Sequence, residues 1–178
     1  MTKNNKVYLL VLTAMFLALT FILPFFTGQI PTVGKALSPM HIPVLLCGFF
    51  CGPWFAMGLG FVAPLLRSLL FGMPPMVPVA IPMAFELACY GFLAGLLYQM
   101  LPKRNLYIYV ALIVAMLGGR IVWGLVKFAM AGLVNVPFSF DMFLAGGFMN
   151  AVPGIILHIV LIPILVMALK KYTYKYQA

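Results

Sequence analysis

The apolar stretch from Tyr107 to Val134 places the strongest constraint on how this chain can fold. It is longer than the roughly 20 residues that a helix needs to cross the hydrocarbon core of a bilayer. Arg120 and Lys127 lie within it, and helical spacing puts them on one face with Trp123. A charge at membrane depth costs about 3 kcal/mol, so such side chains turn inward and pair. The stretch therefore predicts a functional site inside a membrane protein.

Composition supports this class. The sequence is 65% hydrophobic and 7% charged, which leaves too few charges to cover a soluble domain. The net charge of +9 could indicate nucleic-acid binding, but most cations flank apolar runs instead of forming a basic face. We therefore expect an all-α integral membrane protein.

Basic clusters set the expected topology. Treating residues 41–71 as one span would put Lys103 and Arg104 on the side opposite Lys3 and Lys6. A break at Cys51-Gly52-Pro53 returns every cluster to one side, as the positive-inside rule requires. We therefore predict six transmembrane helices in a single domain, with a short second and third helix and both termini cytoplasmic. Their ranges are about 7–26, 41–50, 54–71, 79–101, 107–134 and 142–169.

Two connections carry further signals. The long loop from Thr27 to Met40 is a candidate lid, with Gly28, Gln29 and Lys35 as its substrate-contacting residues. Ser38 followed by Pro39 predicts the N-cap and first residue of the second helix. Ser139 and Asp141 similarly mark the start of the last helix, with Asp141 as a helix-cap residue.

The polar membrane residues gather in the predicted outer half. Counting about 1.5 Å per residue puts Glu86, Lys127 and Asn150 at similar depth, with Arg120 about 10 Å further in. Arg67 lies near the outer end of the third helix. Three cations against one anion predict a cavity for a small anion such as a carboxylate.

Further side chains are candidates for this site, and one pair of residues has an alternative role. Tyr90 lies one helical turn from Glu86 and would form an apolar wall with Trp123. His41 is a further ligand candidate, whereas His158 is expected to be a packing residue deeper in the membrane. Glu86 and Arg120 could instead form a purely structural ion pair between two helices.

Several functions are disfavoured by what the sequence lacks. Cys47, Cys51 and Cys89 have no histidine or second cysteine pair to complete a metal set, so we expect no metal and no cofactor. The sequence also contains no pair of acids and no nucleophile with a base, so we do not expect an enzyme. A stand-alone carrier or channel remains an alternative, although we find no clear internal symmetry.

These residues resemble a family, the substrate-binding S components of energy-coupling-factor (ECF) vitamin transporters. The likeness covers nearly the whole chain. It rests on the pair Ala14 and Ala18, the long loop after the first helix, the six-span count, and the stretch LSPMHIPVLLCGFFCGP from Leu37 to Pro53. The region around Met40 to Pro43 is most similar to S components assigned to pantothenate.

The resemblance implies a function and partners. The protein would bind a vitamin, pantothenate or alternatively pyridoxine, hydroxymethylpyrimidine or folate, at the outer face of a bacterial cell membrane. Ala14 and Ala18 would dock on a membrane T component, which works with two ATPases. The chain itself has no Walker-type glycine loop with lysine, as expected of a subunit that relies on separate ATPases.

Overall fold

The computed structural model describes residues 3–26, 37–134 and 137–173, and every regular element in these ranges is helical. The elements are α1 (Lys3–Phe26), α3 (His41–Cys51), α4 (Pro53–Phe71), η1 (Met76–Ala80), α5 (Ile81–Met100), α6 (Asn105–Val134), α7 (Phe140–Gly147), η2 (Met149–Ala151) and α8 (Val152–Thr173). Five of the described segments are long and apolar enough to cross a membrane, and α3 is a shorter apolar helix. The all-α membrane class is thereby confirmed.

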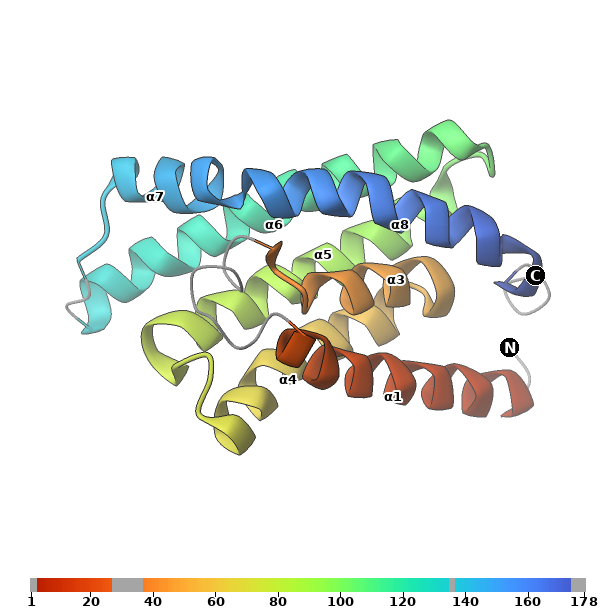
Figure 1. The fold of residues 1–178 in the computed structure, drawn as a ribbon, viewed down its shortest axis with the longest axis horizontal. Coiled ribbons are helices and arrows are strands. Elements are labelled where there is room, and N and C mark those ends of the chain that lie inside the picture. Colours follow the sequence, from red (N-terminus) through yellow and green to blue (C-terminus); the bar gives the residue numbers. More distant parts are fainter. Residues whose placement is uncertain (1–2, 27–36, 135–136, 174–178) are drawn as a thin grey trace.

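From α1 to α6 successive long helices run in opposite directions along the long axis of the molecule, and α7 and α8 follow each other in one direction (Figure 1). α1 begins and α8 ends at the same end of the bundle, which we call the terminal end; the other is the distal end. α5 is central, because it packs against α3, α4 and α6. Large apolar side chains such as Leu10, Trp54 and Leu133 point outward, as expected for helices in lipid.

α5 and α4 approach each other through paired glycines. A Cβ atom added to Gly60 would overlap the carbonyl oxygen of Leu87. A Cβ atom added to Gly91 would lie 2.6 Å from the carbonyl oxygen of Ala56. Neither position has room for a side chain. The glycines therefore let two backbones pack closely, as small residues do between membrane helices.

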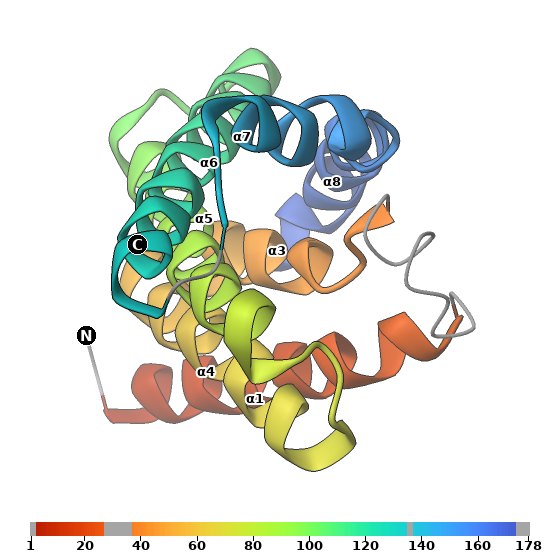
Figure 2. The ribbon, with the colours of Figure 1, turned by 90° about the vertical axis from the view of Figure 1, so that its left-hand side faces the viewer.

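The predicted break between α3 and α4 is confirmed. Gly52 has φ +89°, a backbone conformation that favours glycine, and Pro53 is the first residue of α4. α3 is consequently a half-length helix, and all of its residues are buried. Figure 2 shows α3 inside the bundle, where it packs against α1, α4, α5 and α8. These neighbours shelter a segment too short to cross a membrane unaided.

The second helix begins at His41, as its predicted range has it, but the predicted N-cap is wrong. Met40, not Ser38, is the N-cap of α3, and no side chain caps it. Ser38 has φ +47°, and its carbonyl oxygen accepts a hydrogen bond from the His41 backbone N–H at 3.0 Å. A tight turn therefore lies where Ser38 and Pro39 predicted the N-cap and first helical residue.

The last predicted span, 142–169, is also not one continuous helix. Ser139 does cap α7, since its side chain accepts a hydrogen bond from the Met142 N–H at 3.3 Å. The helix then ends at Gly147, passes through η2 and resumes as α8. Pro153 explains the break, because it lacks an N–H and clashes with the preceding turn, but is tolerated in the first turn of α8.

Candidate functional site

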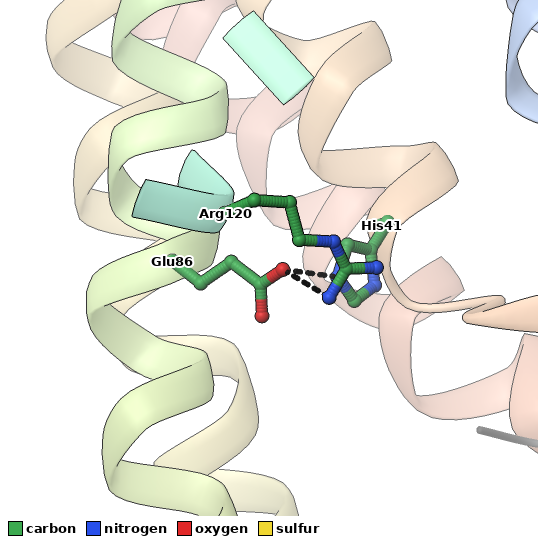
Figure 3. A network of polar contacts seen from close by, with 3 residues as sticks. All are labelled: His41, Glu86 and Arg120. Carbon is green, nitrogen blue, oxygen red and sulfur yellow. Dashed lines mark ion pairs between the residues drawn. The ribbon is translucent and has the colours of Figure 1, made fainter. Parts of the chain in front are cut away.

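An ion pair inside the bundle joins α5 to α6. The Arg120 Nη1 atom lies 2.8 Å from Glu86 Oε1 (Figure 3). The Glu86 side chain is 3% exposed and that of Arg120 is 11% exposed, so water screens the pair little. Glu86 and Arg120 thus form the ion pair that the sequence offered as an alternative, and each compensates the charge of the other.

His41 approaches the same carboxylate from α3. Its Nε2 atom lies 3.7 Å from Glu86 Oε1, a distance longer than a hydrogen bond (Figure 3). His41 is the first residue of α3, and α3 begins about halfway along the bundle (Figure 1). The half-length helix therefore delivers this imidazole to the centre of the molecule and not to its distal end.

Tyr90 completes the α5 side of the site. Tyr90 is 1% exposed, and the centroid of its ring lies 5.3 Å from that of the His41 ring. The ring also lies against Gly119 of α6, where a Cβ atom would overlap two ring carbons. Glycine at position 119 therefore provides the space in which Tyr90 lies beside the ion pair.

His158 is the site residue that sequence reasoning missed. It is 2% exposed, and its ring stacks on that of His41 with centroids 5.8 Å apart and planes 18° apart. His158 is thus a buried packing residue, as expected, but it packs on His41, a contact that the sequence did not predict. The available signal was its position on a stripe with Gly147, Asn150 and Gly154 along the last helix.

Together these residues form what we call the polar cluster: His41, Glu86, Tyr90, Arg120 and His158. Several of their buried polar atoms have no hydrogen-bond partner in the part of the chain that the structure describes. These atoms are both ring nitrogens of His41, the Tyr90 hydroxyl, Arg120 Nε, His158 Nε2 and Glu86 Oε1, which has only its ion-pair contacts. Unpaired buried polar atoms are costly and rare. Their concentration across four helices marks this cluster as the candidate site.

Counting residues from the outer ends gave the wrong depth for Arg120. α6 has 30 residues and spans about 45 Å, whereas α5 has 20 and spans about 30 Å. α6 extends beyond α5 toward the distal end (Figure 1). Arg120, predicted about 10 Å deeper than Glu86, therefore lies at its level.

Lys127 and Trp123 lie in a second, aromatic group. The Lys127 Nζ atom is 5.9 Å from the ring centroids of both Trp123 and Phe138. Trp123 packs edge-on against Phe138 at 5.6 Å and stacks on Phe143 at 6.2 Å. Lys127 is two helical turns from Arg120 on α6, about 10 Å along the axis. We call Trp123, Lys127, Phe138 and Phe143 the aromatic group.

The structure does not bring two other predicted residues into the polar cluster. Arg67 donates a hydrogen bond from Nη1 to the Phe21 carbonyl oxygen at 2.7 Å, and its guanidinium lies 5.2 Å from the rings of Phe25 and Phe71. It therefore joins α4 to α1. Asn150 lies in η2 with an exposed side chain.

The remaining predicted positions fall elsewhere. Gly28, Gln29 and Lys35 of the expected lid lie outside the described residues. Ala14 and Ala18 are exposed on one face of α1. Among the described residues no group of three or more histidine, cysteine or acidic side chains could hold a metal ion.

The comparisons identify the family. A family model described as the ECF transporter substrate-specific component matches residues 9–166. No curated protein and no solved structure matches the chain. The family match covers every residue of the polar cluster and of the aromatic group. Because the matched region spans most of the sequence, the chain belongs to the family of ECF transporter substrate-specific components.

Proposed function

We propose that the polar cluster and the aromatic group form one substrate site, and that the substrate is a small anionic vitamin, with pantothenate the best candidate. The family assigns the chain to the substrate-specific subunit of a membrane transporter, not to an enzyme. Components of this family bind small substrates and work with T and ATPase modules.

The observation that carries the proposal is the set of buried polar atoms without protein partners among the described residues around the Glu86–Arg120 pair. A purely structural ion pair would need hydrogen bonds to its remaining polar atoms to offset desolvation. Here Arg120 Nε and the neighbouring Tyr90 hydroxyl lack them. Ligand sites commonly combine a few such polar groups with apolar and aromatic walls.

The charges favour a ligand with one anionic end. Glu86 compensates Arg120 within the polar cluster. We assign the carboxylate to Lys127, whose Nζ atom lies among the rings of the aromatic group, 5.9 Å from those of Trp123 and Phe138. Trp123 packs on the apolar middle of the ligand. Glu86 accepts hydrogen bonds from hydroxyl or amide groups of the ligand. Arg120 holds Glu86 in position and contacts the ligand through Nε, which has no partner among the described residues.

The distance between Arg120 and Lys127 along α6 is similar to the length of a pantothenate molecule. Arg120 and Lys127 lie about 10 Å apart along α6. An extended pantothenate molecule measures roughly 10 Å from its carboxylate to its far hydroxyl, at the rise per bond of an extended backbone. One molecule could therefore contact both groups.

The proposed setting is a bacterial plasma membrane, with the aromatic group toward the outside and both termini inside. The chain delivers its vitamin through a T component with two ATPases. Ala14 and Ala18 provide the docking face on α1, since both side chains are small and exposed. Gly28, Gln29 and Lys35 contribute a lid, and Asn150 a peripheral contact.

Titration calorimetry of the purified protein with pantothenate tests this function. We expect saturable binding, and at least tenfold weaker binding to Arg120→Ala, because a ligand hydrogen bond to a charged group is lost. Pyridoxine, hydroxymethylpyrimidine and folate are the competing ligands. Tighter binding of any of these, or none of pantothenate, would contradict the assignment.

A further inference from the structure

We infer that His41 and His158 form a paired-imidazole contact that selects substrates by the hydroxyl groups at their neutral end. The inference rests on the proposed function, because it names the part of the ligand that the polar cluster recognises. It adds two specificity-determining residues to the site, one of them from α8.

The two rings lie together beside the Glu86–Arg120 pair. They come from different helices and stack with centroids 5.8 Å apart. His41 also lies 3.7 Å from the Glu86 carboxylate and beside the Tyr90 ring. With at most 3% of each residue exposed, both rings have lost their contact with solvent. Three of their four ring nitrogens have no hydrogen-bond partner among the described residues.

The chemistry of these atoms favours a hydroxyl-bearing ligand. A neutral imidazole has one donor nitrogen and one acceptor nitrogen. A carboxylate only accepts hydrogen bonds, so it would leave the acceptor nitrogen of His41 unpaired and lie close to the Glu86 charge. A hydroxyl group both donates and accepts. A ligand end with hydroxyl groups can therefore pair with both kinds of atom.

Discrimination follows from the burial of the pair. An analogue without hydroxyl groups would leave buried polar atoms of the site unsatisfied, which costs more than the bond itself contributes. Sites built to bind a hydroxyl reject the analogue that lacks it far more strongly than apolar pockets reject a missing methylene. The histidine pair thus selects for the hydroxyl end, while Lys127 selects for the carboxylate end.

The test compares two variants with three ligands by titration calorimetry. The ligands are pantothenate, an analogue lacking both hydroxyl groups, and an analogue with an alcohol in place of the carboxylate. His158→Phe keeps an aromatic ring and removes both nitrogens. Lys127→Met is the matched control at the other end of the site, with similar side-chain length and no charge.

We expect His158→Phe to bind pantothenate at least about tenfold more weakly than the wild type does, and to bind the analogue without hydroxyls as the wild type does. It should still prefer the carboxylate over the alcohol. Lys127→Met should lose that preference and keep the preference for hydroxyls. Equal weakening of all three ligands by His158→Phe, or no weakening, would overturn the inference.

The experiment separates failure of the proposed substrate from failure of the histidine inference. His41→Phe should give the same pattern as His158→Phe, so the test stands if one variant does not fold, as judged by size-exclusion chromatography and circular dichroism. Wild-type protein that binds none of the three ligands would overturn the proposed substrate and this inference with it. Wild-type binding with unchanged hydroxyl preference in both folded histidine variants would overturn this inference alone.

Discussion

At the scale of single residues, the Glu86–Arg120 pair raises the question of what a buried ion pair contributes. Desolvation of two charges can exceed their mutual attraction, so such a pair is weak evidence for stability. Both groups are nearly inaccessible to solvent, and polar atoms around them lack partners among the described residues. We therefore expect stability and ligand binding to respond differently when the pair is altered.

Glu86→Gln should destabilise the protein by about 3 kcal/mol, because it leaves Arg120 buried without a counter-charge. The double variant Glu86→Leu with Arg120→Met should recover most of this loss, since no uncompensated charge remains. It should nevertheless fail to bind the substrate. Thermal unfolding in detergent and ligand titration measure the two effects.

The double variant also separates the two interpretations of the pair. Full binding by a stable double variant would show that the pair serves structure alone. A double variant less stable than Glu86→Gln would contradict our account of its electrostatics.

At the scale of helices, α6 determines how Tyr90 is placed. Gly119 has no room for a side chain, since a Cβ atom there would overlap the Tyr90 ring. Gly119→Ala should therefore cost about 1–3 kcal/mol through overpacking and weaken ligand binding. Gly132 lies on the same helix, and a Cβ atom added there would have nothing within 4 Å of it.

Gly132→Ala is the matched control, and it should be neutral or slightly stabilising because alanine favours helices. Unfolding temperatures and ligand affinities of the two variants provide the measurement. Equal effects of the two substitutions would contradict the packing that we describe for Tyr90.

Sequence patterns predicted the elements better than their relative depth. The positive-inside rule located the break at Gly52-Pro53, and Ser139 capped the last segment as expected. Depth along the axis was not predictable from residue counts, because helices of unequal length do not begin at one level. That error separated Arg120 from Glu86, and it assigned His158 to a different depth from His41.

Other parts of the site depend on tertiary contacts that one sequence does not reveal. Arg67 was expected to face the cavity, but its guanidinium satisfies a carbonyl of α1 and lies over two phenylalanine rings. The break at η2, with Pro153 just beyond it, leaves Asn150 exposed. Local patterns identified which residues were polar, but not which neighbours they would meet.

At the scale of the whole molecule, α1 lies at the edge of the bundle, where it packs on α3 and α4. Ala14 and Ala18 are exposed, whereas Leu9, Phe16 and Thr20 are buried against the bundle. The small exposed residues leave a surface that another helix could approach closely. We assign this surface to the T component.

Ala14→Leu should leave substrate affinity unchanged, because the substituted side chain points away from the polar cluster. Uptake of the substrate by cells that contain the full transporter should fall strongly, since the larger side chain keeps the T component away. Ala14→Ser is the control of similar size and should transport normally. Loss of binding in Ala14→Leu, or normal uptake, would contradict the docking assignment.

The most direct test of the account is the small molecule that the protein retains through purification. Mass spectrometry should detect one low-molecular-weight anion bound to the wild type and none, or far less, bound to folded Arg120→Ala. The same amount of the same molecule on both proteins would show that the polar cluster is not the substrate site.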